Sequence, residues 1–367
     1  MKICIFISGD LWGGAEAQVY QLVSRLLDIS SHDIIVVTLN KNELYQKFSE
    51  LPIATICLNE RTMSVKELVF SFRNLLKRHK VNLVHCHGFK ENFIAGLSTF
   101  LVRGVKLVRT HHGRGVVSGS RVKRLIENIN AKYLTDKLIC VSHELKNYLQ
   151  SLGYPKNKIV TIHNGIDCQQ LILTKDREML LNQYGIDQNT FVIGTASRIE
   201  AEKGYQFLLS ATNSLINKGV NVCLFLVGDG SLSETYKREA AKLGIKDAVI
   251  FAGFKQDAIN YINMFDVFVM MSLNEGIPIA LIEAMCLSKT VVSSAVGGIP
   301  EVIDSMKNGI LVPSGDADAC ADAIYDVYKD EILRKSLEDE AHLKAQNSFS
   351  ADTCATETLA LYERVIY

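Results

Sequence analysis

The hydrophobic positions of this 367-residue chain follow two alternating patterns. Short runs of apolar and β-branched residues, such as KICIFIS at 2–8, indicate buried strands. Between these runs, apolar residues recur every three or four positions, as they do at 65–76, and this spacing indicates helices. Ser64 and Glu67 have the spacing of a capping box, which marks the start of that helix. Strands that alternate with helices predict a parallel, doubly wound α/β sheet.

The strands fall into two series, so the pattern predicts two doubly wound sheets. We expect strands at 2–8, 33–39, 53–58, 82–87, 105–112, 137–142 and 158–167 in the first series, and at 191–197, 223–230, 248–254, 267–272 and 290–294 in the second. The length agrees with two domains, and a hydrophobic content of 48% is enough for two cores.

Charge is distributed unevenly along a chain whose formal net charge is zero. Residues 1–168 carry 23 Lys and Arg against 13 Asp and Glu, whereas residues 169–367 carry 17 against 27. The positive first half therefore suggests an anionic surface or partner for that half.

Targeting signals and paired cysteines are not apparent in the sequence. Neither the N-terminus nor a later segment has the pattern of a signal peptide or of a membrane-spanning helix. The nine cysteines are scattered singly without a C-x-x-C, which argues against a disulfide framework and a zinc ribbon. We therefore expect a soluble, cytoplasmic protein in a reducing compartment.

The stretch at 266–301 carries the most distinctive chemistry. It predicts a strand, then a turn with a glycine, then a helix for which Pro278 suits the first position. This order directs free backbone N–H groups and the positive end of a helix dipole at one point, which favours a phosphate. Glu275 and Glu283 flank that point, and sugar hydroxyls are suitable partners for their carboxylates. The stretch therefore suggests a ligand that is part phosphate and part polyol. The alternative is that Glu275 only favours the helix dipole and that Glu283 is a solvated helix residue.

Two other strand ends carry candidate phosphate ligands. Gly13 and Gly14 follow the first strand and would let a ligand approach the backbone closely, although an ordinary turn is the alternative. Arg198 and Lys203 follow the strand at 191–197 and can hold a diphosphate, although a solvated loop is the alternative. No G-x-G-x-x-G follows a strand, which argues against a dehydrogenase.

Four histidines, His85, His87, His111 and His112, fall at the carboxyl ends of expected strands, where ligands of such sheets bind. A metal site is one interpretation, and a core or hydrogen-bonding role is another. We expect no metal, because His111 and His112 point to opposite faces and no carboxylate lies nearby in the sequence. A D-x-D at 316–318 begins a helix, so its first aspartate is expected to cap that helix.

Several motifs together resemble glycosyltransferase family 4, whose fold is GT-B. They are S-x-x-E-G-x-P-x-x-x-x-E-A-M at 272–285, G-G-x-P-E at 297–301, R-x-x-x-x-K-G at 198–204 after Gly194, T-x-H-G at 110–113, G-G-A-E at 13–16 and NGID at 164–167. The resemblance implies two Rossmann-like domains that face each other across a cleft. We expect an acceptor-side domain at 1–170, a nucleotide-sugar-binding domain at 171–350, and a helix at 351–367 that crosses back to the first.

The resemblance also implies roles for residues. His112 and Glu275 would orient the donor sugar, and Arg198 and Lys203 would bind the departing diphosphate, so these four are the expected catalytic residues. Glu283 would contact the ribose. The expected donor-binding residues are Gly13, Gly14, Phe254, Gly276, Ile277, Pro278 and Glu283. Phe254 would pack near the nucleobase, with a place in the core as the alternative.

The activity that follows is that of a retaining glycosyltransferase. It would move a hexose or N-acetylhexosamine from a nucleotide-diphosphate donor, expected to be a UDP-sugar, to an acceptor hydroxyl. The expected setting is bacterial surface polysaccharide, lipopolysaccharide or lipid-linked oligosaccharide synthesis, with no cofactor, no divalent metal and no nucleic acid. The alternatives are a sugar-nucleotide epimerase of the same fold and a nucleotide-sugar-binding protein without catalysis.

The segment at 121–134 predicts a basic, amphipathic helix. Residues 103–146 contain ten Lys and Arg against three Asp and Glu, and a mobile loop is expected at 116–120. Ordinary packing on the sheet is one interpretation of the helix. The other is contact with an anionic membrane, which would put the protein on the cytoplasmic face of the inner membrane, where a lipid-linked or glycan acceptor lies.

Overall fold

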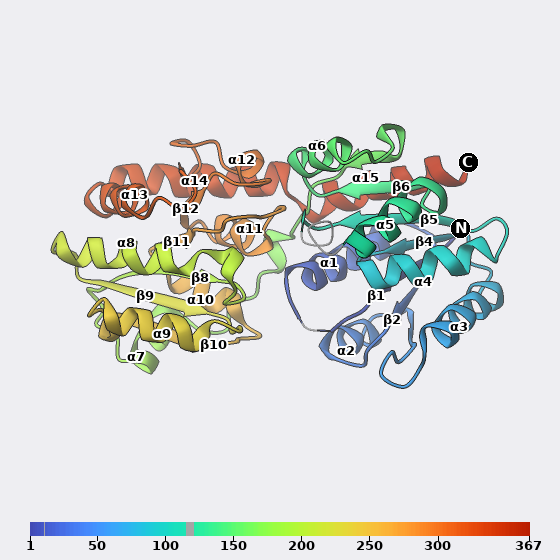
Figure 1. Cartoon of the computed structure of the whole chain (residues 1–367). Helices are drawn as coiled ribbons and strands as arrows, with labels where there is room; N and C mark the ends of the chain where they lie inside the picture. Colours follow the sequence, from blue (N-terminus) through green and yellow to red (C-terminus); the bar gives the residue numbers. More distant parts are fainter. Residues whose placement is uncertain (11, 115–120) are drawn as a thin grey trace. The chain divides into compact units, whose positions relative to one another are not determined.

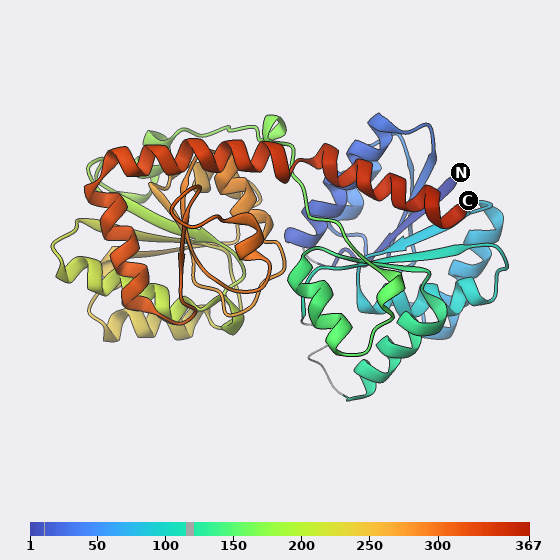
Figure 2. The same ribbon diagram turned by 90° about the horizontal axis from the view of Figure 1, so that it is seen from above.

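The computed structural model describes residues 1–10, 12–114 and 121–367, with side chains of the helix at 121–129 described from Leu125 onward. The chain divides into two compact units. The N-terminal unit comprises Met1–Gly165 and Ala351–Tyr367, and the C-terminal unit comprises Ile166–Ser350. Figures 1 and 2 both show the two termini close together, within the N-terminal unit.

The described part of the N-terminal unit contains a parallel sheet of seven strands in the order β3-β2-β1-β4-β5-β6-β7. Its strands are β1 Lys2–Ile7, β2 Asp33–Thr38, β3 Ala54–Cys57, β4 Leu83–Cys86, β5 Lys106–His111, β6 Lys137–Cys140 and β7 Ile159–Thr161. Its helices are α1 Gly14–Ile29, α2 Glu43–Ser49, α3 Val65–Arg78, α4 Phe89–Phe100, α5 Arg121–Ile129, η2 Asn130–Leu134, α6 His143–Ser151, η3 Lys156–Lys158 and α15 Ala351–Ile366. Apolar residues of α1, α2 and α15 pack on one face of the sheet, and those of α3 and α4 pack on the other.

The C-terminal unit contains a parallel sheet of six described strands in the order β10-β9-β8-β11-β12-β13. Its strands are β8 Phe191–Ala196, β9 Val222–Val227, β10 Val249–Gly253, β11 Val267–Met270, β12 Thr290–Ser294 and β13 Ile310–Val312. Its helices are η4 Cys168–Gln170, α7 Arg177–Tyr184, η5 Ala201–Lys203, α8 Tyr205–Asn217, α9 Ser233–Lys242, η6 Lys246–Ala248, α10 Ala258–Met264, α11 Ile279–Cys286, α12 Ile299–Val302, α13 Ala317–Lys329 and α14 Glu331–Ser348. One core joins α8, α9 and α13 to a face of this sheet.

The expected fold class is confirmed, since both sheets are parallel and doubly wound. The capping box is also confirmed, because the Ser64 side chain accepts from the backbone of Glu67 while the Glu67 carboxylate accepts from Ser64. Strand β13 was not expected, since three residues in NGILVPSG are too few to show a period. Pro278 is the N-cap of α11 and not its first residue, because its ψ of 124° is extended.

The helix expected at 121–134 is α-helical to Ile129 and continues as a π-helix in η2. The loop expected at 116–120 and the side chains of Arg121, Lys123 and Arg124 lie outside the described residues. None of the described helices is long and apolar enough to cross a membrane.

Helix α15 is part of the N-terminal unit, although it follows the C-terminal unit in the chain. Its residues Ala355, Leu361 and Tyr362 are buried in the same core as the apolar face of α1. An ion pair between Arg25 of α1 and Asp352 of α15 lies at the edge of this contact. Figure 2 shows α14 and α15 as successive long helices in red.

The absence of a disulfide framework was expected, but the structure contains one disulfide, Cys168–Cys286, within the C-terminal unit. The two cysteines are 118 residues apart, so no local spacing in the sequence could reveal the pair. The disulfide joins η4 to the last residue of α11.

Candidate active site

The turn between β11 and α11 brings together a carboxylate, a hydroxyl and a cation. Glu275 Oε1 accepts a hydrogen bond from Ser272 Oγ at 2.7 Å and pairs with Lys203 Nζ at 2.6 Å. The Glu275 and Lys203 side chains are only 10% and 17% exposed. Because the pair is sheltered from water, its mutual attraction is stronger than that of a surface ion pair. Lys203 and Glu275 are 72 residues apart in sequence, and the structure brings these two expected catalytic residues into direct contact.

Two glycine turns bring this arrangement together. Gly204 has a φ of +65°, and a Cβ there would lie 1.9 Å from the carbonyl oxygen of Met271, so the loop that carries Lys203 fits directly against the end of β11. Gly297 has a φ of +54°, and its Cβ would lie 1.9 Å from the carbonyl oxygen of Glu275. Gly298 then donates its N–H to the carbonyl of Gly276 at 3.1 Å. The motif G-G-x-P-E therefore supports the turn that carries Glu275.

Arg198 differs from Lys203 in its surroundings. Its side chain is 69% exposed and forms an ion pair with Glu202 at 3.5 Å. A guanidinium in this position is free to turn towards a ligand, because an exposed ion pair of this kind costs little to break. The structure therefore brings Lys203 to Glu275 and leaves Arg198 in solvent.

Glu283 is a partly buried carboxyl on α11. Its side chain has no hydrogen-bond or ion-pair partner among the described residues, and burial raises its pKa to about 7. The raised pKa means that the charged carboxylate is poorly stabilised by its surroundings. Such a carboxylate is suited to accept hydrogen bonds from neutral hydroxyls.

The remaining donor-side residues of the C-terminal unit lie at or beside the carboxyl ends of strands. Phe254 follows β10 and is 52% exposed, so the alternative that placed it in the core is wrong. Gly276 and Pro278 lie in the turn before α11, and Ile277 between them is buried. An exposed aromatic ring at the ligand-binding edge of a sheet can stack on a nucleobase.

In the N-terminal unit, Gly13 is the N-cap of α1 and Gly14 is its first residue. The carbonyl of Gly13 accepts the first bond of the helix, from Ala17 at 2.9 Å. A Cβ on Gly13 would lie 3.3 Å from a carboxylate oxygen of Glu16. This is the strand, turn and helix order in which backbone N–H groups face an anion.

The histidines divide between two sides of the N-terminal sheet. His87 Nδ1 lies 3.3 Å from His112 Nε2, and the rings of His85 and His87 lie 4.1 Å apart. His111 points elsewhere and its ring meets Tyr154 edge to face. The structure therefore selects His112 over His111 as the neighbour of His87, as the alternation of side chains along a strand requires.

All four histidines are held neutral. Burial and the neighbouring His112 lower the pKa of His85 to about 3, and burial together with Arg109 lowers the pKa of His112 to about 4. Burial lowers the pKa of His87 and of His111 well below its ordinary value. Within the described residues these four do not form a group of three metal-ligating atoms. Asp316 of the D-x-D caps α13, since its carboxylate accepts from the N–H of Ala319 at 2.9 Å.

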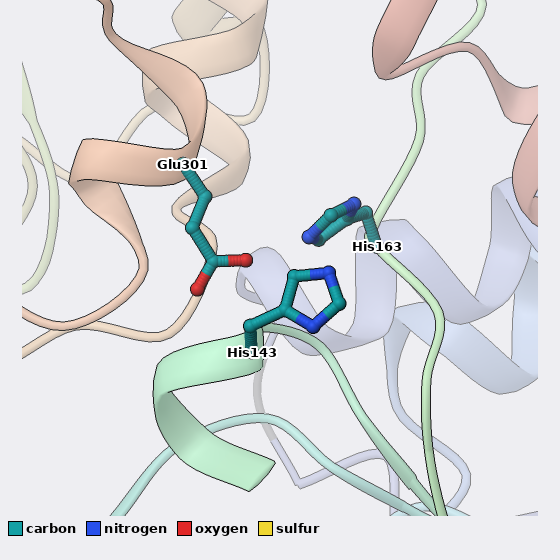
Figure 3. Close-up of side chains that lie close together, drawn as sticks. All are labelled: His143, His163 and Glu301. Atoms are coloured by element: carbon teal, nitrogen blue, oxygen red, sulfur yellow. The ribbon is translucent and has the colours of Figure 1, made fainter. Parts of the chain in front are cut away.

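A second pair of histidines in the N-terminal unit was not predicted from the sequence. His143 begins α6, and His163 follows β7; their rings meet edge to face with centroids 5.4 Å apart (Figure 3). The signal was available, because each follows the carboxyl end of a strand. Glu301, also labelled in Figure 3, belongs to α12 of the C-terminal unit.

A polar cluster at the carboxyl edge of the N-terminal sheet was also missed. Lys90 Nζ lies 3.2 Å from Asp10 and 2.9 Å from Glu60, and Asn40 Nδ2 donates to the same two carboxylates. These residues follow β1, β2, β3 and β4, so their common position depends on the strand order, which the sequence does not give.

Comparisons with known proteins agree with this architecture. A family model described as glycosyltransferase family 4 matches residues 12–170, and a model described as glycosyl transferases group 1 matches residues 176–344. Together the two models match most of the chain.

Curated relatives include several proteins that are named as glycosyltransferases. N-acetyl-alpha-D-glucosaminyl L-malate synthase of Bacillus anthracis is 26% identical over 82% of this chain and 79% of its own length. The UDP-Gal:alpha-D-GlcNAc-diphosphoundecaprenol alpha-1,3-galactosyltransferase of Escherichia coli is 26% identical over 77% of this chain and 75% of its own length.

Solved structures share the fold. Alr3699/HepE of Anabaena, solved in complex with UDP-glucose, matches with a TM-score of 0.89 at 21% identity, over 99% of this chain and all of that one. A glycosyltransferase of Rickettsia africae matches with a TM-score of 0.85 at 22% identity, over all of this chain and 98% of that one.

Proposed function

Because the chain belongs to glycosyltransferase family 4 and is a glycosyltransferase with the GT-B fold, we propose that it transfers a sugar from a UDP-sugar to an acceptor hydroxyl with retention of configuration. The sugar is a hexose or an N-acetylhexosamine, and the product belongs to a bacterial surface polysaccharide, a lipopolysaccharide or a lipid-linked oligosaccharide. The observation that carries the proposal is the sheltered contact of Lys203 with Glu275 at the turn before α11.

The reaction breaks the bond between the anomeric carbon and the diphosphate oxygen. Lys203, Arg198 and the backbone N–H groups before α11 stabilise the charge that develops on the diphosphate. The acceptor oxygen bonds to the anomeric carbon on the face that the diphosphate leaves, and the proton of the acceptor hydroxyl passes to the departing diphosphate. Lys203 also holds the Glu275 carboxylate, which then accepts from sugar hydroxyls and fixes the donor.

The other donor contacts follow from the surroundings of each residue. Glu283 accepts from the ribose hydroxyls, in keeping with its raised pKa and its lack of a partner among the described side chains. In the C-terminal unit, Phe254 stacks on the base, and Gly276, Ile277 and Pro278 contact the phosphates and sugar. In the N-terminal unit, Gly13 and Gly14 offer backbone N–H groups to the donor. The UDP-glucose complex of HepE and the UDP-Gal in the name of the Escherichia coli relative support uracil as the base.

The first experiment is a thermal-stability screen of the purified protein against UDP, GDP, ADP and their sugar derivatives. A bound ligand raises the melting temperature by mass action, so uridine compounds should give the largest shift. Release of UDP is then measured with and without an extract of bacterial glycolipid acceptors, with Lys203→Ala as the inactive control. Release that depends on the acceptor supports transfer.

Two outcomes would favour the alternatives. Conversion of one UDP-sugar into another without an acceptor would identify an epimerase. A melting shift without UDP release or conversion, in the presence of every acceptor tried, would identify a binding protein.

The acceptor is proposed to be anchored at an anionic membrane that the N-terminal unit approaches. Support comes from the ten basic against three acidic residues at 103–146, and from Leu125, Ile129 and Tyr133, which are exposed on α5 and η2. Apolar side chains beside basic ones suit the interface of an anionic bilayer, and salt weakens the attraction.

Co-sedimentation with anionic and neutral vesicles tests this surface. Wild-type protein should bind anionic vesicles at low salt, and the triple change of Arg121, Lys123 and Arg124 to Glu should abolish that binding. The same charge change at Lys66, Lys77 and Arg78 of α3 is the matched control and should bind nearly as well as wild type. Equal binding to both vesicle types would contradict the proposed anionic membrane surface, and the acceptor would then be a soluble molecule.

A further inference from the structure

His112 uses one of its two ring nitrogens for a contact with His87. His112 Nε2 lies 3.3 Å from His87 Nδ1, and His112 Nδ1 has no partner among the described residues. His87 is only 5% exposed, and its own Nε2 is buried without a hydrogen-bond partner in the described part of the chain. All the residues of this contact belong to the N-terminal unit.

Both rings are neutral, because their pKa values are lowered by burial. A neutral imidazole carries one N–H and one bare nitrogen, so only two arrangements satisfy the contact. In the first, His112 Nε2–H donates to His87 Nδ1, and a proton on His87 Nε2 is then buried without an acceptor. In the second, His87 Nδ1–H donates to His112 Nε2, and His87 Nε2 is a bare acceptor.

The first arrangement leaves a buried N–H donor at His87 Nε2 without a partner among the described residues, and the second leaves a buried acceptor there. Buried N–H groups without an acceptor are rarer in proteins than acceptors without a donor, and an unmet donor costs its full desolvation. The second arrangement is therefore favoured. It gives His112 its proton on Nδ1, which is the nitrogen left for the substrate.

We propose that His87 is a positioning residue that fixes His112 as a neutral Nδ1–H donor, which bonds to an oxygen of the donor sugar. The proposal rests on the role of His112 in the proposed function. It adds the direction of the hydrogen bond: the sugar oxygen accepts from His112, whereas Glu275 accepts from sugar hydroxyls.

His85 and its two hydrogen-bond partners, Tyr362 and Thr110, hold His87 in place. His85 uses both ring nitrogens, with Nδ1 at 2.5 Å from Tyr362 Oη and Nε2 at 2.7 Å from Thr110 Oγ1. Its ring packs against that of His87 with centroids 4.1 Å apart. Tyr362 belongs to α15, so the last helix of the chain supports the orientation of His112 through His85 and His87.

The test is long-range proton–nitrogen NMR of the protein labelled with nitrogen-15 histidine. In wild type, the spectrum of His112 should show the proton on Nδ1. His87→Asn keeps a polar atom at the position of Nδ1 and should preserve that tautomer, whereas His87→Phe and His87→Gln should not. A wild-type His112 protonated on Nε2 would overturn the proposal.

Kinetics give a second readout. His87→Phe should lower kcat by about tenfold, the worth of one oriented hydrogen bond, with less change in the donor KM. His87→Asn should recover most of that loss, and His87→Gln should not. Equal activity of His87→Asn and His87→Gln would contradict a positioning role, and this comparison remains available if His87→Phe does not fold.

One variant separates this proposal from the proposed function. If His112→Ala turned over at the wild-type rate, the assigned role of His112 would be wrong, whereas the tautomer measured by NMR would still decide the His87–His112 bond.

Discussion

The carboxyl edges of the two sheets have the same backbone architecture, but the expected sugar- and phosphate-binding side chains on them differ in charge. In the C-terminal unit this edge carries charged groups, with Lys203 and Glu275 in contact and Arg198 in solvent. In the N-terminal unit the histidine cluster is buried and neutral. A parallel sheet therefore fixes where ligands bind, while the residues after each strand decide whether that place suits a phosphate or an uncharged hydroxyl.

From this difference we expect the two edges to tolerate substitutions differently. A sheltered ion pair leaves a bare charge when one partner is removed, whereas a neutral hydrogen bond leaves only an unmet polar atom. Changes at the charged edge are therefore expected to affect both turnover and stability.

The largest effect is expected at the two cations. Lys203→Ala and Arg198→Ala should each lower kcat by about 10²-fold or more, because both remove a charge that meets the leaving diphosphate in the proposed function. Lys203→Ala should also lower the free energy of unfolding by about 1–3 kcal/mol, since it leaves the Glu275 carboxylate without its cation. Arg198→Ala should leave stability unchanged, because its side chain is exposed. Steady-state kinetics and urea unfolding measure both quantities.

Lys237→Ala is the matched control, since it breaks an exposed ion pair with Glu234 in the same unit. Its effect on stability should stay within about 0.5 kcal/mol, and its turnover should equal wild type. Near-normal turnover in both the Lys203 and Arg198 variants would show that the phosphate site lies elsewhere.

The next effect concerns the backbone that supports the charged edge. Gly297→Ala should raise the donor KM and lower kcat by about tenfold or more, because the new Cβ displaces the turn that carries Glu275. Gly219→Ala is the matched control, since Gly219 also has a positive φ but has nothing within 4 Å of the added Cβ. Both should lose stability from the strained φ, so equal kinetics in the two variants would rule out the supporting role of Gly297.

The sequence predicted the parts of this comparison that depend on local pattern. Strands, the capping box and the motif around Glu275 could be recognised because their signals lie within a few residues. Contacts between distant segments could not, and the Lys203–Glu275 pair, the Cys168–Cys286 disulfide and the support of His85 by Tyr362 are all of this kind. They depend on strand order and on the return of α15, which hydrophobic periodicity does not encode.

A smaller effect is expected on the pH dependence of stability, through the ionisation of Glu283. Its pKa in the folded protein, about 7, lies above its ordinary value of 4.5, so the native state holds a proton that the unfolded chain releases. Stability should therefore fall as the pH rises from about 4.5 to about 7 and should change little above that range. Glu283→Gln removes this fall and should raise the free energy of unfolding at pH 8 by on the order of 1–3 kcal/mol. Urea unfolding across this pH range measures the effect.

Glu178→Gln, at an exposed position on α7, is the control and should keep the wild-type slope. The Glu283 variant should also bind UDP more weakly, because an amide accepts less strongly from ribose hydroxyls than a carboxylate does. A stability profile that ran parallel to wild type would mean that Glu283 is solvated like any surface carboxylate.

The smallest effect is expected from removal of divalent metal. In the proposed function, two side-chain cations and a helix N-terminus meet the charge of the diphosphate at the C-terminal edge, so a chelator should change kcat by less than about twofold. Asp316, the first residue of the D-x-D, is engaged as the cap of α13. Loss of activity that manganese restores would contradict this expectation, and Asp316→Asn would then identify the metal site, because asparagine keeps the cap while weakening a metal ligand. A rate independent of metal would leave the cations Lys203 and Arg198 as the groups that meet the diphosphate, in contrast to the neutral histidines of the N-terminal unit.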